Sequence, residues 1–268
     1  MKGRTNNAIT GAPESWVEPF SYYATHLDEL GAVLQAHYDG VIDLSTVWSV
    51  GDTVTDIPLS AISASSLGSD SQNAQNIDLV ILDFNHDTLT SDTSKKAAIT
   101  VGQLDLLVLP GKIYSSHNSY TYSRYTQSPR RTWLNSDYYN ALPSDLKSLI
   151  KPVQKKSCYS SGSAGGNQSE TTSETCWLAS NREIFGQDIP PSFDSSTTAV
   201  DGTQYSYYST QSNRVKKLGK TGPAYSWWSR SGFLLSIGSV YFVHCNTDGS
   251  QLYYYPSTAY GLAPCFSL

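Results

Sequence analysis

Tyrosine is the residue type that sets this sequence apart, and it gathers towards the C-terminus. The chain has 268 residues, among them 19 tyrosines and one methionine. Tyrosine joins a large, rigid ring to a hydroxyl group, and together with serine and glycine it makes surfaces that adapt to many ligands. In an extended strand Tyr253, Tyr254 and Tyr255 must point to both faces, so at least one ring should reach solvent. The pattern favours a recognition surface, and a tyrosine-lined core edge is the alternative.

The other residues that could do chemistry form no catalytic or metal motif. Residues 83–87 (Asp-Phe-Asn-His-Asp) gather oxygen and imidazole ligands, but their spacing fits no calcium loop. A turn, in which Asn and Asp side chains bond nearby backbone groups, explains the same residues. The five histidines belong to no recognisable nucleophile motif, although a triad could still assemble in space, and no glycine-rich phosphate loop is present. We therefore predict a protein that is not an enzyme and has no cofactor or metal, with an enzyme acting on cell-wall polymers as the less favoured alternative.

The four cysteines are expected to be free thiols. Cys158, Cys176, Cys245 and Cys265 match neither a zinc pattern nor a dense disulfide framework. A bridge from Cys158 to Cys176, closing the Ser/Gly-rich stretch between them, is the alternative, and its geometry does not follow from sequence.

The charge balance argues against nucleic acid as a partner. Charged residues make up 15% of the chain, and 18 basic against 23 acidic residues give a net charge of -5, which does not suit a phosphate-binding surface. The short basic runs at 155–156 and 214–217 are interpreted as solvated loop positions. No apolar stretch follows the first basic residues and none reaches membrane-spanning length, so we expect synthesis in a cytoplasm and no membrane insertion.

Residues 1–40 are predicted to be an N-terminal attachment arm followed by a short helix. The first part, residues 1–22, lacks periodicity and contains two prolines. Over residues 26–38 apolar side chains recur at helical spacing, and Asp39-Gly40 ends the run. Residues 41–268 are predicted to form one domain.

Short β-type runs open this domain, and helices follow in its middle. The expected strands are residues 47–50, 57–62, 77–84 and 98–101, whereas residues 99–110 admit either a strand or a helix. Residues 133–142 are predicted to be a helix capped by Asn135 or Ser136, with Pro143 opening a second helical turn.

A low-complexity segment and a capped helix come next. Residues 157–175 are predicted to be a surface loop because of their Ser, Thr and Gly content. Residues 176–179 then form a buried strand. Ser180 caps a brief helix with Glu183 in capping-box position, and Gly186 ends it.

The C-terminal region 226–268 is predicted to combine a framework with a recognition surface. Trp227, Trp228, Arg230 and residues 261–268 have the residue types of a core frame.

Between these framework residues the pattern loosens. If residues 233–245 form a strand, apolar side chains lie on both of its faces. This pattern indicates either an apolar face exposed to solvent or a strand that is buried on both faces. Residues 246–250 contain Asp-Gly turn chemistry, so residues 251–260 should return as the second arm of a hairpin.

Several segments together resemble an uncharacterised domain family of Gram-positive bacteria and their phages. The resemblance rests on residues 131–139 (RTWLNSDYY), 177–186 (WLASNREIFG), and 227–231 (WWSRS) paired with 261–268 (GLAPCFSL), and residues 48–52 fit as well.

That family is similar in turn to the formylglycine-generating-enzyme branch of the C-type lectin fold, which includes the variable proteins of diversity-generating retroelements. The resemblance implies an α+β fold over residues 41–268, C-type-lectin-like, with short mixed β-sheets and a few short helices. Residues 261–268 would be its closing core strand. Where relatives carry an Arg near the end of the chain, this sequence has Leu262-Ala263, so a salt bridge made by that Arg is absent.

The resemblance also implies a function. It predicts a phage tail or virion protein, made in the host cytoplasm, that binds a bacterial surface protein or glycan and contacts other virion proteins through residues 1–40. Repetition of the site in a homo-oligomer such as a trimer would raise avidity. A bacterial cell-surface location and a structural module without a diversified site are the alternatives. The predicted contact positions, which would also be the diversified ones, are Phe233, Leu235, Ile237, Ser239, Tyr241, His244, Tyr253, Tyr254 and Tyr255.

Overall fold

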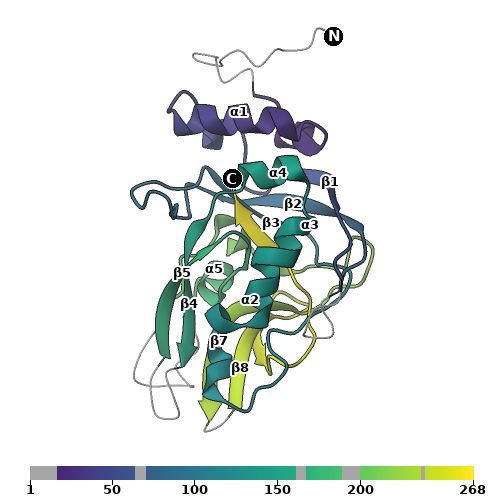
Figure 1. Cartoon of the computed structure of the whole chain (residues 1–268), viewed down its shortest axis with the longest axis vertical. Helices are drawn as coiled ribbons and strands as arrows, with labels where there is room; N and C mark the ends of the chain where they lie inside the picture. Colours follow the sequence, from purple (N-terminus) through teal and green to yellow (C-terminus); the bar gives the residue numbers. More distant parts are fainter. Residues whose placement is uncertain (1–16, 64–70, 161–166, 189–199, 237–238) are drawn as a thin grey trace.

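Three small antiparallel sheets and a few short helices make up the described part of the chain, so the predicted α+β class is confirmed at this level. The structure is a computed structural model (Figure 1), and it describes residues 17–63, 71–160, 167–188, 200–236 and 239–268.

The largest sheet has five strands, and the one that comes last in the sequence lies inside it. In sheet order the strands are β1 (Thr53–Leu59), β2 (Gln75–Phe84), β3 (Ile99–Gln103), β10 (Pro264–Ser267) and β6 (Trp177–Leu178). In β10, Phe266 pairs with Val101 of β3, and Cys265 pairs with Trp177 of β6. All four residues of β10 are buried. Residues 261–268 therefore contribute a core strand, as expected.

The strand expected at residues 47–50 does not form. These residues make turns after the 3-10 helix η3 (Leu44–Thr46). Trp48 is nevertheless in the core, where its ring packs against Phe20 of the 3-10 helix η2 (Phe20–Ala24). The apolar pattern at 47–50 reflects this burial, which does not require a strand.

Residues 17–40 pack on the rest of the domain and do not stand apart from it. Buried side chains of η2 and of α1 (Leu27–Tyr38) join the common core. The Tyr38 hydroxyl donates to the Leu268 carbonyl and accepts from the Ala98 N–H. Residues 1–16 of the expected arm lie outside the described residues.

A β-hairpin occupies most of the segment 157–175 that was expected to be a surface loop. Strands β4 (Val153–Ser160) and β5 (Asn167–Glu174) pair along their whole length. The prediction was wrong because it followed composition alone. Buried and exposed side chains largely alternate along β4, and β5 supplies backbone hydrogen bonds that Ser and Thr content does not reveal. Residues 161–166 lie outside the described residues.

The four cysteines are thiols outside any disulfide, as predicted, and all four are buried. Cys158 lies opposite Ser169 in the hairpin of β4 and β5. The alternative bridge between Cys158 and Cys176 is therefore not formed.

The helix expected at 133–142 begins earlier, at Pro129. Its successive segments are α2 (Pro129–Trp133), the π-helical turn η6 (Leu134–Tyr138), α3 (Tyr139–Ala141) and, after Pro143, α4 (Ser144–Leu149). The N-cap is Ser128, whose hydroxyl accepts from the Arg131 N–H at 3.1 Å. Asn135 does not cap the helix as expected, because its side chain bonds the backbone of the loop after β5, and Ser136 donates back to Thr132.

The segment that was treated as one run at 233–245 is divided between two antiparallel strands. The third sheet contains β7 (Trp227–Ser236), β8 (Ser239–Cys245) and β9 (Gln251–Tyr254) in that order. The predicted turn joins β8 to β9, with the Asn246 N–H donating to the Ser250 carbonyl and Gly249 at a φ of 82°. The predicted hairpin is thus confirmed.

The short helix α5 (Asn181–Phe185) has the predicted capping box. The Ser180 hydroxyl accepts from the Glu183 N–H, the Glu183 carboxylate accepts from the Ser180 N–H, and Gly186 ends the helix at a φ of 69°. The other 3-10 helices are η4 (Tyr120–Ser123), η5 (Tyr125–Gln127), η8 (Ser206–Ser209) and η9 (Gln211–Arg214). In the described part of the chain, no helix has the length and apolar character needed to cross a membrane.

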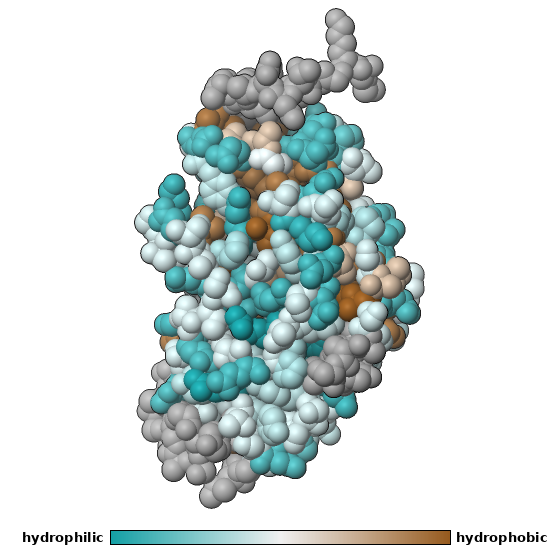
Figure 2. All heavy atoms as spheres, in the orientation of Figure 1, coloured by the Kyte–Doolittle hydropathy of each residue, from teal (hydrophilic) through white to brown (hydrophobic). Residues whose placement is uncertain are grey.

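The two ends of the molecule differ in structure and surface. Figure 1 places α1 at one end, while the hairpins of β4 with β5 and of β7 with β8 point towards the opposite end. Figure 2 shows that hydrophobic residues on this face gather mainly in the half near α1, whereas the half over the hairpins is mostly white to teal.

Candidate functional site

Four partly exposed aromatic side chains lie in a row along one face of the third sheet, each in contact with the next. Strand alternation places Tyr241 of β8 and Tyr253 of β9 on this face, beside Tyr255 just after β9, and His117 comes from a distant loop. The ring centroids lie 5.6 Å apart for Tyr253 and Tyr241, 4.7 Å for Tyr241 and Tyr255, and 4.1 Å for Tyr255 and His117. We call these four residues the aromatic ridge.

Hydrogen bonds hold two members of the aromatic ridge in place. The Tyr241 hydroxyl donates to the Tyr255 hydroxyl at 3.0 Å. This hydrogen bond, together with burial, raises the pKa of Tyr241 to about 12, so its hydroxyl keeps its proton at neutral pH. His117 Nδ1 lies 3.1 Å from the Ser257 hydroxyl, which fixes the imidazole against Tyr255.

The opposite face of β9 presents Leu252 and Tyr254, each 45% exposed. The Tyr254 ring lies 6.1 Å from that of Tyr260, which packs 4.6 Å from the His244 ring. His244 is 3% exposed, and its Nδ1 has no hydrogen-bond partner among the described residues. Burial lowers the pKa of His244 to about 4, so the imidazole is neutral at physiological pH.

The predicted contact positions separate into surface and interior residues. Those that are at least partly exposed are Ser239, Tyr241, Tyr253, Tyr254 and Tyr255. Ile237 lies outside the described residues, as does the side chain of Leu235.

Phe233 and His244 are buried, contrary to their expected role as contact residues. Phe233 is 0% exposed because it packs against Tyr241 and Tyr253. His244 is covered in the same way by Tyr260. Both side chains support the surface from inside and do not form part of it.

Sequence reasoning missed His117, whereas Tyr260 was expected to be a contact residue together with Tyr253 and Tyr255. His117 lies in the polar run Ser-Ser-His-Asn-Ser at residues 115–119, which carries no signal of a contact with Tyr255. Tyr260 belongs to the predicted return arm, but its packing on His244 depends on a chain path after β9 that the sequence does not specify.

A buried ion-pair network holds β7 to neighbouring elements. Arg230 of β7 donates to the two carboxylate oxygens of Glu183 at 2.5 and 2.9 Å. Lys155 of β4 lies 2.5 Å from Glu183 and 2.6 Å from Asp87. Burial pushes the pKa of Glu183 up, but Arg230 and Lys155 outweigh it and hold that pKa below its usual value. Arg230 therefore belongs to the framework, as predicted.

The interpretation of the basic runs as solvated positions is wrong for Lys155 and Lys216, whereas Lys156 and Lys217 are exposed. The side chains of Lys155 and Lys216 are both buried. The Lys155 ammonium lies 4.8 Å from the centre of the Trp177 ring. Lys216 donates to the carbonyls of Gln103 and Leu104, and burial lowers the pKa of Lys216 to about 8. The positions of the lysines in the sequence do not show which of them are buried beside interaction partners.

Residues 83–87 form a turn that leads from β2 into the same network. Asn85 adopts a φ of 48° in this turn. The Asp87 carboxylate accepts from Lys155, Tyr205 and Thr100. Over the described ranges, no group of three or more His, Cys, Asp or Glu residues is placed to hold a metal ion.

Asp201 provides a prediction about pH. Burial raises the pKa of Asp201, although Arg230 opposes this. Because the pKa is higher in the folded state, this carboxyl group stabilises the fold fully when the pH is below its unfolded-state pKa. That stabilisation is lost as the pH rises through the folded-state pKa. We expect Asp201→Asn to match or exceed the wild type in free energy of unfolding at pH 7, and to lose any such advantage by pH 4.

Urea unfolding of both proteins at the two pH values measures this. Asparagine keeps one oxygen to accept from the Arg182 N–H, as Asp201 does at 3.2 Å. A variant that is less stable by the same amount at pH 4 and pH 7 would show that the carboxyl group acts only through its hydrogen bonds.

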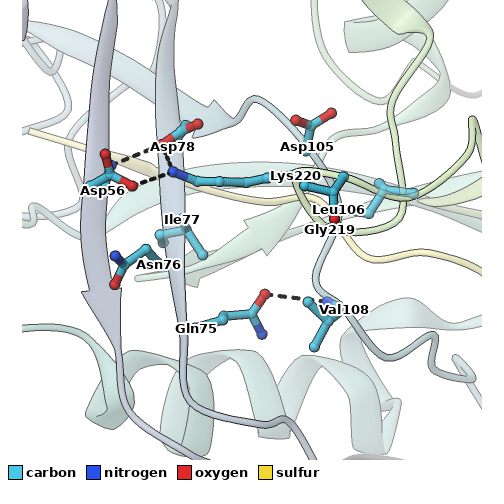
Figure 3. A pocket seen from close by; sticks show the side chains of 11 residues that line it. Asp56, Gln75, Asn76, Ile77, Asp78, Asp105, Leu106, Val108, Gly219 and Lys220 are labelled. Carbon is cyan, nitrogen blue, oxygen red and sulfur yellow. Dashed lines mark hydrogen bonds and ion pairs between the residues drawn. The ribbon is translucent and has the colours of Figure 1, made fainter.

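A polar pocket of about 330 Å³ lies beside β1 and β2. Figure 3 shows Lys220 reaching across it, with its ammonium 2.6 Å from both Asp56 and Asp78. Gln75 accepts from the Val108 N–H. The positive charge of Lys220 is thus compensated by carboxylates of the chain itself. These ion pairs connect the loop that carries Lys220 to the edge of the sheet.

Comparison with known proteins connects most of the chain to one family. The family described as Domain of unknown function (DUF6273) matches residues 89–268. No curated protein and no solved structure matches the chain. The matched residues include the whole aromatic ridge, together with Glu183 and Arg230 of the ion-pair network.

Proposed function

The chain belongs to the family described as Domain of unknown function (DUF6273). From this membership and the geometry of the third sheet, we propose that the chain is a non-enzymatic protein that binds a bacterial surface molecule. The aromatic ridge carries this proposal. It places four partly exposed rings in contact on one sheet face, and exposed aromatic clusters mark binding surfaces.

The exposure of Tyr254 favours a surface role over the structural alternative. A module whose C-terminal tyrosines served only as core would bury these rings. Tyr254 is 45% exposed, and the three tyrosines of the aromatic ridge are partly exposed.

The strongly perturbed carboxyl groups support binding rather than catalysis. Asp87, Glu183 and Asp201 are buried and engaged with other groups of the chain. A catalytic acid or base must come within hydrogen-bond reach of its substrate, so these groups serve the framework.

We further propose a role as a phage tail or virion protein, with a bacterial cell surface as the alternative location. The separation of α1 from the hairpin of β7 and β8 (Figure 1) supports it, because residues 1–40 could attach to other virion proteins while the hairpin end faces outward. Assembly as a homo-oligomer such as a trimer would raise avidity without new contacts.

A C-type-lectin-like fold and a retroelement-diversified C-terminal region are part of this proposal. The capped helix α5 after β6 and the inner position of β10 agree with what the resemblance implies. An adenine-rich near-copy of the 3' end of the gene beside a reverse-transcriptase gene would support diversification. A genome with neither would remove that part of the proposal.

The binding role is tested by replacing three neighbouring tyrosines together. Tyr253→Ala/Tyr254→Ala/Tyr255→Ala is expected to weaken adhesion to target bacterial cells at least about tenfold, since a buried aromatic contact contributes about 1 kcal/mol or more to binding. Labelled protein and flow cytometry measure the adhesion.

Tyr22→Ala is the matched control. Tyr22 is also partly exposed and stacks on a histidine, His26, with ring centroids 4.0 Å apart, but it precedes α1 at the other end of the molecule. The proposal fails if the triple variant adheres as well as the wild type and as well as the Tyr22 variant.

A further inference from the structure

Charged side chains are almost absent from the segment that forms the third sheet. Among residues 226–268 the acidic and basic residues are Arg230 and Asp248. Arg230 is buried in its pair with Glu183. Asp248 lies in the turn between β8 and β9, where it accepts from the N–H and the hydroxyl of Ser250 at 2.9 and 2.6 Å. The exposed carboxylate of Asp248 lies in the turn before β9, whereas Tyr254 and Tyr255 lie at the end of that strand. Apart from Asp248 and histidine, the segment offers a ligand no exposed charge to pair with.

What the surface offers is hydroxyl groups beside ring faces. The Tyr255 hydroxyl accepts from Tyr241, and no described residue accepts its own proton. The hydroxyls of Tyr254 and Tyr260 have no hydrogen-bond partner among the described residues either. Serines add further hydroxyls, since Ser239 and Ser257 are partly exposed.

We infer that the ligand of this surface is an uncharged glycan, an inference that rests on the proposed binding function and specifies its ligand class. A pyranose ring has C–H faces, which are attracted to the electron-rich face of an aromatic ring, and a rim of hydroxyls that donate and accept hydrogen bonds. Tyr254 lies on the other face of the edge strand β9, but its ring centroid is 5.5 Å from that of Tyr255. Around this sheet edge, Tyr254 and the aromatic ridge provide both kinds of partner.

Charged ligands fit this surface less well. An anionic or cationic polymer would have to lose water from its charges without gaining an ion pair in return, which costs free energy. Protein partners commonly contribute arginine among their hot-spot residues, and the acidic side chain that this segment offers to an arginine is Asp248, in the turn before β9.

The inference is tested with immobilised polysaccharides and the full-length chain. Neutral glucan, mannan and galactan are compared with anionic polygalacturonate and cationic chitosan. We expect retention on at least one neutral polymer, with an affinity that changes less than about twofold between low and high salt because no exposed ion pair is screened. Retention on the charged polymers alone, or on none, overturns the inference.

Variants connect that binding to the residues named. Tyr254→Ala and Tyr255→Ala are each expected to weaken retention on the neutral polymer about tenfold, and Tyr255→Phe to weaken it less because the ring remains. Tyr22→Ala should bind as the wild type does. Equal retention by all four variants would place the glycan elsewhere on the molecule and overturn the assignment.

Cell adhesion separates a failure of the inference from a failure of the proposed function. Periodate cleaves vicinal diols of surface glycans, whereas protease removes surface proteins. Adhesion that is lost after periodate and kept after protease supports the glycan. Adhesion that is lost after protease only, and still abolished by the triple tyrosine variant, leaves the binding function standing and overturns the glycan.

Discussion

Replacing Arg230 with alanine is expected to lower the free energy of unfolding by about 3–5 kcal/mol, because it breaks a buried ion pair and leaves Glu183 with Lys155 alone as a cationic partner. Glu183 would stay in the interior without its bidentate cation. The same change removes hydrogen bonds to the carbonyls of Lys156 and Leu178, which connect β7 to β4 and β6. Urea unfolding followed by tryptophan fluorescence at pH 7 measures the loss.

Arg182→Ala is the matched control for this prediction. Arg182 pairs with Asp188 at 2.6 Å, but both side chains are 32% exposed, so its loss should cost no more than about 1 kcal/mol. Arg230→Lys should fall between the two, since lysine keeps the charge and loses the bidentate geometry. Equal effects of Arg230→Ala and Arg182→Ala would contradict a special role for the buried network.

Between pH 7 and pH 4, the free energy of unfolding is expected to fall by about 3 kcal/mol less in His244→Phe than in the wild type. Burial lowers the folded-state pKa of His244 to about 4, from its usual value of 6.5. A histidine with a lowered pKa contributes stability that is present above its unfolded pKa and is lost as pH falls through the folded pKa. Each pKa unit corresponds to about 1.4 kcal/mol.

The comparison requires the free energy of unfolding of both proteins at both pH values. Protonation of Asp87 and Glu183 in acid also destabilises the protein, because Lys155 and Arg230 outweigh burial and lower the pKa values of these two carboxyl groups. This loss of stability is the same in the wild type and in the variant. Tyr260→Phe removes the neighbouring hydroxyl and keeps the imidazole, so its pH dependence should match the wild type. A His244→Phe variant with an unchanged difference between pH 7 and pH 4 would count against the argument.

Elements with a local chemical signal could be predicted from the sequence. The capping box of Ser180 and Glu183 and the stop at Gly186 involve residues within one turn of each other, so spacing alone locates α5. The Asp-Gly turn at 246–250 locates the hairpin of β8 and β9 for the same reason.

Features that depend on distant partners could not be predicted. The pairing of β4 with β5 follows from register and not from composition. Lys155 is buried because Asp87 and Glu183 meet it from elsewhere in the chain. His117 reaches Tyr255 across a still larger separation in sequence. In each case the sequence names the residues, and the three-dimensional path decides whether they meet.

The position of β10 has a consequence for synthesis on the ribosome. Its two neighbours, β3 and β6, are made well before it, yet they hydrogen-bond to β10 and not to each other. The nascent chain therefore carries two unpaired strand edges until residues 264–267 have emerged, and such edges are templates for aggregation. Translation that stops after β9 would yield the aromatic ridge on a sheet system that still lacks its middle strand.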